Sequence, residues 1–183
     1  MKRRDLLTGA AAALVASPVL PAFASIDLEP HLYPTVVRVK PDFEPGTIHV
    51  VPQAHFLYWI TGNRQAIRYG VGVGRAGLEF SGSAVIQRKA EWPSWTPTAD
   101  MIRRDPGKYA KYADGVPGGP SNPLGSRALY LYQNGVDTYY RIHGTTAPRS
   151  IGRSVSNGCI RMINEHVNDL YARVPVGTKV YVY

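Results

Sequence analysis

Residues 140–162 read YRIHGTTAPRSIGRSVSNGCIRM, and this stretch decides how the rest of the chain is interpreted. It contains the only cysteine of the protein, Cys159, and a histidine sixteen positions earlier, His143. A thiol beside an imidazole is the minimal apparatus for nucleophilic acyl transfer, because the base raises the thiolate fraction. A buried structural cysteine and a core histidine are the alternative interpretation of the same two residues.

Two glycines favour the catalytic interpretation. Gly144 directly follows the histidine, and Gly158 directly precedes the cysteine. Glycine permits positive φ and a close approach of the backbone, as an exposed nucleophile turn requires. We therefore expect the amides of Gly158 and Cys159 to point at a developing oxyanion.

The run before the histidine has the alternation of a β-strand. Val136, Thr138, Tyr140 and Ile142 fall on one face, and the residues between them, ending in His143, fall on the other. This alternation predicts that His143 lies at a strand end on the more polar face, outside the core.

The motif IHGT, a spacer, and SNGCIRM together resemble the signature of the L,D-transpeptidase catalytic domain, the YkuD family. That signature has His-Gly, a spacer of about this length, then Ser-x-Gly-Cys, a hydrophobic residue and Arg. The resemblance extends upstream through EWPSWTPT at 91–98 and NPLGSRALYL at 122–131, and covers roughly residues 47–183. Many members have His where this chain has Asn157, so a role for a second imidazole is not carried over.

The resemblance implies a cysteine-dependent acyltransferase that acts on peptidoglycan. The Cys159 thiolate would attack the amide after the third residue of a stem tetrapeptide and form a thioester. His143 would take the thiol proton and deliver it to the leaving D-amino acid, and an acceptor amine would then resolve the thioester. The acceptor stays open: another stem peptide, an outer-membrane protein or a free D-amino acid.

The remaining candidate site residues surround this pair. Arg161 would project to the same side as Cys159 if Ile160 packs inward, and is predicted to hold a substrate carboxylate. Its alternative role is to tie down the turn by bonding backbone carbonyls. Further substrate-binding candidates are Ser156, Asn157, Gly144 and Thr145. We expect no cofactor and no metal, because the other histidines show no ligand spacing.

The first 24 residues have the features of an export signal. Residues 2–4 are basic, residues 6–20 are rich in Ala, Leu and Val, and residues 22–24 read Ala-Phe-Ala, which predicts cleavage before Ser25. The alternative is a membrane anchor, but the apolar run is short and interrupted by prolines. The paired arginines resemble a twin-arginine signal, although ordinary secretory signals also carry them. The predicted location is the periplasm, with no anchor after processing.

Export gives the single cysteine a specific meaning. An exported chain with one cysteine forms no internal disulfide, so its thiol is free and reactive or bridges two molecules. The formal net charge of +8 is scattered along the chain, without a basic helix or an RNA-binding signature, so nucleic acid is not expected as a partner. Basic charge suits a carboxylate-rich polymer such as peptidoglycan, and it also fits an ordinary solvated surface.

Strand and turn signals predict a mostly β domain, a sandwich or barrel with one or two short helices. After an extended arm at 25–46, with an edge strand at 35–39, the catalytic domain would occupy 47–183. Strands are predicted at 48–51, 55–60, 66–73, 83–89, 127–132, 136–142 and 178–183. Thr61-Gly62-Asn63 and Asn134-Gly135 are the predicted hairpin turns.

Two segments are not strand-like. Residues 91–124 are rich in proline and predict a long functional loop with one helical turn at 100–104, whose Trp92 and Trp95 either line a groove or pack under the loop. A helix is predicted after the cysteine, capped by Asn164 and ended by Gly177. Its apolar stripe comprises Val167, Leu170, Tyr171 and Val174.

Three rival functions share some of these features. In a papain-like peptidase the cysteine precedes the histidine, whereas here it follows. An L,D-carboxypeptidase would use water as the acceptor on the same stem peptides. A catalytically silent peptidoglycan-binding protein would show a degraded motif or an added carbohydrate-binding repeat, and neither is visible in the sequence.

Overall fold

The computed structural model describes residues 28–78 and 80–183, so the predicted export leader lies outside the described residues. The strands are β1 (Thr35–Arg38), β2 (Ile48–Val51), β3 (Phe56–Gly62), β4 (Gln65–Gly70), β5 (Val73–Gly74), β6 (Gly82–Glu91), β7 (Arg127–Gln133), β8 (Val136–His143), β9 (Ser154–Ser156), β10 (Ile160–Arg161) and β11 (Lys179–Val182). The helices are α1 (Ala99–Arg104), α2 (Pro106–Tyr109) and α3 (Asn164–Arg173). Four single 3-10 turns are η1 (Pro30–Leu32), η2 (Pro52–Ala54), η3 (Ala110–Tyr112) and η4 (Pro148–Ser150).

One mixed sheet dominates the described residues, and the predicted mostly β class is confirmed. Its strand order is β1-β4-β3-β2-β11-β6-β7-β8-β10, and β5 pairs with β9 beside it. The pairs β2–β11 and β8–β10 are parallel, and the other neighbours in the large sheet are antiparallel. Three short helices accompany the strands, instead of the one or two expected.

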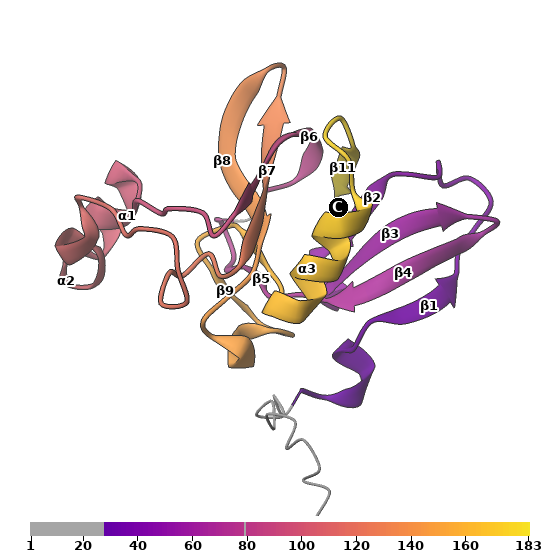
Figure 1. Ribbon diagram of the computed structural model, residues 1–183, viewed down its shortest axis with the longest axis horizontal. Helices are drawn as coiled ribbons and strands as arrows, with labels where there is room; N and C mark the ends of the chain where they lie inside the picture. Colours follow the sequence, from indigo (N-terminus) through magenta and orange to yellow (C-terminus); the bar gives the residue numbers. More distant parts are fainter. Residues whose placement is uncertain (1–27, 79) are drawn as a thin grey trace, which may run out of the picture.

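The helix α3 supplies one side of the core. Figure 1 shows it lying across the sheet, between the half that contains β6–β8 and the half that contains β2–β4. The stripe predicted for this helix is confirmed, since Val167, Leu170 and Val174 are buried in the core and Tyr171 packs against it. Burying such side chains contributes roughly 1.5–3 kcal/mol each.

The predicted ends of α3 are wrong. Ile163 occupies the N-cap position, and Asn164 is the first helical residue, with its side chain bonded elsewhere. The helix ends at Arg173, well before Gly177, because Pro175 restricts Val174 to an extended backbone.

Two hairpin turns lie near the predicted places. Asn134 and Gly135 have φ values of 50° and 79°, which is the positive-φ pair that a type I′ turn requires, so the turn between β7 and β8 is confirmed. The other hairpin turns one to two residues later than predicted. Asn63 and Arg64 carry its positive φ values, and Thr61 and Gly62 belong to β3.

The N-terminal arm completes the sheet. Its predicted edge strand is observed as β1, which pairs antiparallel with β4 at the edge of the sheet. The turn η1 places Leu32, together with Leu28, against Ile151 and Ile163 in a small second apolar cluster. The arm therefore packs onto the segment that leads to the cysteine.

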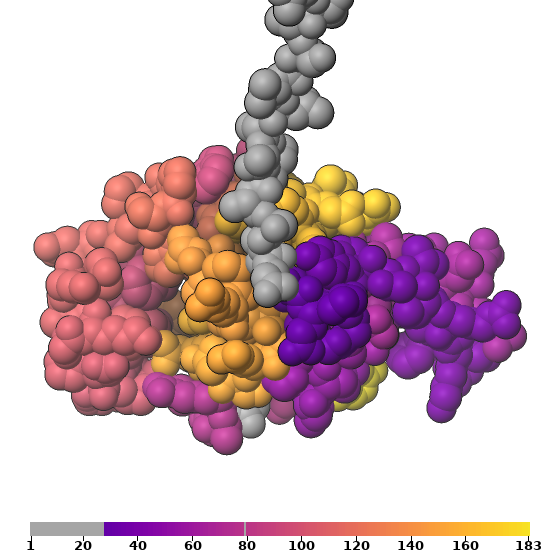
Figure 2. Space-filling view, turned by 90° about the horizontal axis from the view of Figure 1, so that it is seen from below, coloured from indigo at the N-terminus to yellow at the C-terminus, as the bar shows by residue number. Residues whose placement is uncertain are grey.

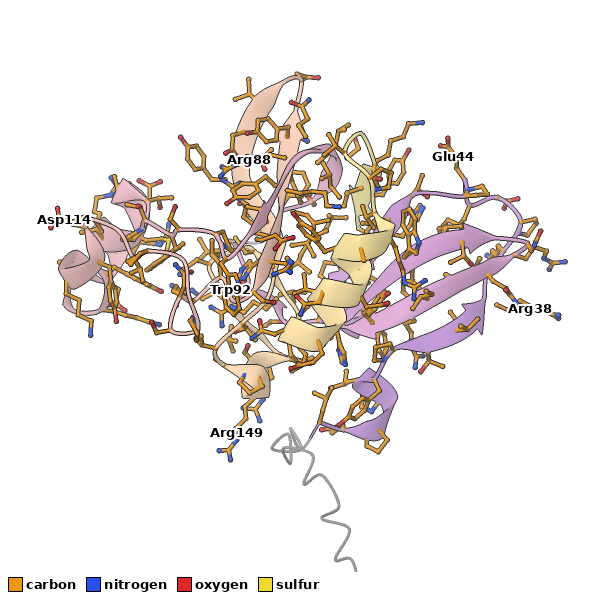
Figure 3. The ribbon with its side chains drawn as sticks, in the orientation of Figure 1. Arg38, Glu44, Arg88, Trp92, Asp114 and Arg149 are labelled. Atoms are coloured by element: carbon orange, nitrogen blue, oxygen red, sulfur yellow. The ribbon has the colours of Figure 1, made fainter. Side chains whose placement is uncertain are left out.

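A long excursion between β6 and β7, residues 92–124, is called the lid. It carries α1, α2 and η3 and projects away from the sheet (Figure 1). Two backbone hydrogen bonds between Trp95 and Val116, of 2.9 and 2.7 Å, close its base. Figure 3 shows Trp92 where the chain leaves the sheet and Asp114 at the outer side of the lid. The prediction of one helical turn at 100–104 is confirmed by α1, which α2 and η3 extend.

Candidate active site

Pairing of two strands brings the cysteine and the histidine to one place. The strand β10 runs parallel to β8, with Ile160 opposite Ile142 and Arg161 opposite His143. His143 is the last residue of β8, and Cys159 lies directly before β10. Both line a cavity of about 1230 Å³ enclosed by the lid and by strands β7, β8 and β10. Figure 2 shows the lid, in pink, beside the orange segment that leads to the cysteine.

The imidazole of His143 is buried and held in one tautomer. Its side chain is only 4% exposed, and Nδ1 donates a hydrogen bond of 2.5 Å to the carbonyl oxygen of Gly144. Because Nδ1 carries the proton, Nε2 is the acceptor. Burial, with the nearby Arg161 guanidinium, lowers the pKa of His143 to about 3. The ring is therefore neutral near pH 7, with Nε2 unprotonated.

The burial of His143 corrects the expectation of a polar position outside the core. The pairing with β7 is regular at this end of β8, with Ile142 opposite Leu129 and His143 opposite Ala128, so His143 does face away from the core residue Ile142, but it is covered there, at the wall of the cavity. An irregularity lies earlier in β8. Tyr130 pairs with Arg141 but Tyr132 pairs with Asp137, so β8 contains extra residues that break the alternation. Tyr139, in the bulge, has a φ of 61°, an uncommon conformation for a bulky residue.

A single carboxylate stabilises this bulge. Asp137 accepts a 2.8 Å hydrogen bond from the Tyr139 amide, and its two oxygens accept 2.7 and 2.8 Å bonds from the Arg141 guanidinium. The bulge also places the carbonyl oxygen of Tyr139 at 3.8 Å from the sulfur of Cys159, which donates to it. The strand irregularity thus positions the Tyr139 carbonyl beside the Cys159 sulfur.

The thiol of Cys159 experiences opposing influences. Burial raises its pKa, whereas the Arg141 backbone amide and the guanidinium charges of Arg141 and Arg161 lower it, with burial dominant. The cavity consequently holds a neutral thiol and a neutral imidazole, without a preformed ion pair.

Ser156 shapes the turn before the cysteine. Its hydroxyl donates to the carbonyl oxygen of Cys159 at 2.6 Å and accepts from the Gly158 amide at 3.0 Å. Gly158 has a φ of 117°, and a Cβ there would collide with the Tyr140 ring and the Leu78 carbonyl. Only glycine fits, as the sequence predicted from the turn. The Gly158 amide, predicted for an oxyanion, is directed at the Ser156 hydroxyl in this conformation.

Gly144 and Thr145 lie behind the histidine and do not line the cavity. The Thr145 amide donates to Asn164 Oδ1 at 3.2 Å, and the Ser126 amide donates to the same oxygen at 3.2 Å. Asn164 thereby joins the segment after His143 to the start of β7. Its role was missed because an asparagine at the start of a helix is typical of a cap.

Asn157 connects the nucleophile turn to the lid. Its Nδ2 donates to the Tyr109 hydroxyl at 2.7 Å, and its Oδ1 accepts from Arg75 at 3.3 Å. Tyr109, on α2, was not singled out in the sequence, because no local motif marks a tyrosine in a proline-rich segment. Of the two predicted tryptophans, Trp95 lines the cavity, whereas Trp92 is 45% exposed and lies outside it.

Arg161, two residues after Cys159 on β10, also lines the cavity. Its side chain is half-buried and makes no hydrogen bond or ion pair within residues 28–78 and 80–183. No contact among these residues therefore supports the alternative role, in which Arg161 would hold the turn by bonding backbone carbonyls. Burial lowers the pKa of its guanidinium. Across the same described ranges no cluster of three metal-ligating side chains occurs, and none of the helices has the length and apolar character needed to cross a membrane.

Comparisons with known proteins agree on one family. Residues 45–182 match the YkuD L,D-transpeptidase catalytic domain. Over 143 residues the chain is 36% identical to the probable L,D-transpeptidase ErfK/SrfK of Escherichia coli K12, covering 75% of this chain and 43% of the relative. The probable L,D-transpeptidase YbiS of the same organism is also 36% identical, covering 74% and 45%. The chain thus spans less than half the length of these curated relatives.

Solved structures share the fold. A structure from Brucella melitensis, named as a probable carnitine operon oxidoreductase, is 52% identical with a TM-score of 0.59 and covers 85% of this chain and 96% of its own. L,D-transpeptidase 3 from Mycobacterium tuberculosis is 16% identical with a TM-score of 0.53, and the match covers 75% of this chain and 60% of that one. At this identity the likeness is evidence for the fold only. Because the domain match covers most of the residues, from β2 through β11, this chain belongs to the YkuD family of L,D-transpeptidase catalytic domains.

Proposed function

We propose that this protein is a peptidoglycan L,D-transpeptidase that works through a thioester on Cys159. The observation that carries the proposal is the shared cavity, in which the chain's one thiol lies with a neutral imidazole whose Nε2 is the acceptor. Family membership supports the substrate class. The Gly144 carbonyl replaces the carboxylate that orients the histidine in many other nucleophile–base sites.

The proposed steps use the groups that line the cavity. The Cys159 sulfur attacks the amide carbonyl after the third residue of a stem tetrapeptide, and its proton passes to Nε2 of His143. The carbon–nitrogen bond then breaks, and the imidazolium gives the proton to the departing amine. An acceptor amine attacks the thioester, loses a proton to Nε2, and releases the thiolate, which recovers that proton.

The oxyanion that forms in each half-reaction needs hydrogen-bond donors. We assign this role first to the Cys159 amide. The Gly158 amide joins it once the amide leaves the Ser156 hydroxyl, a rearrangement within one turn. Such donors typically contribute about 10²–10³-fold to turnover.

Arg161 supplies recognition in this proposal. Stem peptides carry free carboxylates near the attacked carbonyl, and a guanidinium binds a carboxylate through two parallel hydrogen bonds. Its half-buried position beside Cys159, without a partner among the described residues, suits this role. Export to the periplasm and a stem peptide or an outer-membrane protein as acceptor complete the proposal.

The decisive experiment incubates the mature protein with defined disaccharide-tetrapeptides and identifies the products by mass spectrometry. We expect crosslinked dimers, and a protein adduct whose mass corresponds to the disaccharide-tripeptide acyl group on wild type only. Cys159→Ala should lose both while it keeps its melting temperature. Release of the terminal residue without crosslinks would indicate a hydrolase instead, and turnover by Cys159→Ala would refute the thioester.

A further inference from the structure

Two hydrogen-bond donors face the active-site cavity without a protein acceptor. One is the guanidinium of Arg161, which no carboxylate or carbonyl among residues 28–78 and 80–183 engages. The other is the hydroxyl of Tyr109. This oxygen accepts a 2.7 Å hydrogen bond from Asn157, and its own proton has no acceptor in the described part of the chain.

The Tyr109 hydroxyl is fixed in place as well as unsatisfied. The residue is only 8% exposed. Its ring meets the Trp95 ring edge-on at 6.3 Å between centroids, and the ammonium of Lys108 lies 5.2 Å from the ring centroid. Asn157, which orients the oxygen, is itself held by Arg75. A buried donor aimed in a fixed direction without an acceptor costs free energy, which a ligand oxygen relieves.

The two donors belong to opposite walls of the cavity. Tyr109 comes from α2 in the lid, and Arg161 comes from β10 beside the nucleophile. They lie close enough for Tyr109 to influence the pKa of the Arg161 guanidinium. The cavity lining as a whole is basic, since it contains Arg104, Lys108, Lys111, Arg141 and Arg161 against Asp100 alone. The complementary ligand is an anion with two oxygens.

We propose that Tyr109 is a specificity-determining residue whose hydroxyl binds, jointly with Arg161, one carboxylate of the acyl donor. Asn157 acts as a positioning residue that occupies a lone pair of the Tyr109 oxygen and so turns its proton toward the substrate. This inference rests on the proposed function, since it names how the same site selects its donor. The carboxylate bridges lid and sheet, so the lid closes on donors that carry it.

The test compares wild type with Tyr109→Phe, which keeps the ring against Trp95 and removes only the hydroxyl. Three donors are used: the stem tetrapeptide, the same peptide with a C-terminal carboxamide, and the peptide amidated on the side chain of its third residue. We expect Tyr109→Phe to lower kcat/KM for the free acid by about 10–100-fold, mainly through KM. The penalty should vanish on whichever carboxamide removes the recognised group, which identifies the carboxylate.

Tyr112→Phe is the matched control. Tyr112 also lines the cavity and meets the Trp95 ring edge-on, at 5.8 Å between centroids, but the hydrogen bond of Asn157 goes to Tyr109 instead. It should behave as wild type on all three peptides. If Tyr109→Phe lowers kcat/KM equally for all three peptides, Tyr109 only holds the lid in place and the inference is wrong. No effect on the free acid would refute it as well.

Binding separates this inference from the proposed function. In a Cys159→Ala background, calorimetric titration with the free-acid tetrapeptide should show a Kd about 10-fold weaker or more when Tyr109→Phe is added. If that difference appears while the wild type makes no thioester, the transpeptidase proposal fails and the carboxylate site stands. If crosslinks form but the two Kd values agree, the carboxylate site fails and the transpeptidase stands.

Discussion

The charge state of the Cys159 thiol depends on a balance between burial and nearby positive charge. Burial raises the thiol pKa, and the amide of Arg141 with the guanidinium groups of Arg141 and Arg161 opposes it. His143 is neutral because its pKa is lowered to about 3. Cys159 and His143 are therefore both uncharged near neutral pH, unlike a thiolate–imidazolium pair, whose sulfur reacts readily at that pH.

The pH dependence of alkylation tests this description. The second-order rate with iodoacetamide should keep rising with pH beyond the ordinary thiol pKa, since only the thiolate reacts. Arg161→Gln removes one of the opposing charges, so it should shift the profile to higher pH. kcat/KM should show no acid limb near pH 6.5, because the His143 pKa lies far below that value. A plateau of alkylation already at pH 6–7 would contradict the neutral pair.

Gly158 lies in the turn before Cys159, at a position where there is no room for a side chain. Gly158→Ala introduces a Cβ at a φ of 117° and into contact with the Tyr140 ring and the Leu78 carbonyl. Backbone strain of this kind costs about 1–3 kcal/mol, so we expect a lower free energy of unfolding and a severe loss of turnover. Gly177→Ala is the control, because its φ of 95° is comparable but nothing lies within 4 Å. Equal activity losses in both variants would show that backbone strain, not the local contact, is responsible.

Some side chains hold together helices and strands that are far apart in the sequence. Asn164 begins α3 yet bonds the amides of Ser126 and Thr145, so the helix start, the start of β7 and the segment after His143 move together. Asn164→Ala leaves two buried amides without an acceptor and should lower the free energy of unfolding by about 1–3 kcal/mol for each unsatisfied group. It should also slow acylation by loosening His143.

A matched substitution separates this bridge from a helix cap. Asn164→Asp keeps an acceptor oxygen at the same place, so urea unfolding at pH 7 should show a midpoint near that of wild type. If Asn164→Ala unfolds at the wild-type urea concentration, the bridge contributes little. The readout is the midpoint of unfolding together with the rate of acyl-adduct formation.

The strands, turns and helices that could be predicted from the sequence are those that neighbouring residues determine by themselves. Asn134-Gly135 requires the positive φ values of its turn, and the stripe on α3 follows from helical spacing. The bulge in β8 was not predictable, because its residues alternate like a regular strand and the irregularity is set by the pairing with β7 and by the Asp137–Arg141 contact. The lid contact of Asn157 with Tyr109 joins residues 48 positions apart, which no local pattern encodes.

The whole molecule buries three imidazoles in separate places. His49 stacks on Tyr181 in the far half of the sheet, His143 lies in the active site, and His166 packs edge-on against Tyr33. Burial is the main reason that the pKa of each is lowered, and for His166 it outweighs the opposing charges of Glu165 and Asp169. Each folded site therefore prefers the uncharged ring.

These depressed pKa values predict acid destabilisation that begins above the range of the carboxylates. Below about pH 6.5 the unfolded chain binds a proton on each of these histidines while the folded chain does not, so stability falls as pH falls. The pKa of Asp169 is lowered mainly by its hydrogen bond with Arg173. Asp169 therefore adds to this loss of stability only as the pH falls to its ordinary pKa of 3.8 and below. The midpoint of urea unfolding should thus be lower at pH 5 than at pH 7. His166→Met removes one titrating ring from α3 and should make that decline shallower, whereas equal midpoints for the wild type at both pH values would show that burial does not hold these rings neutral.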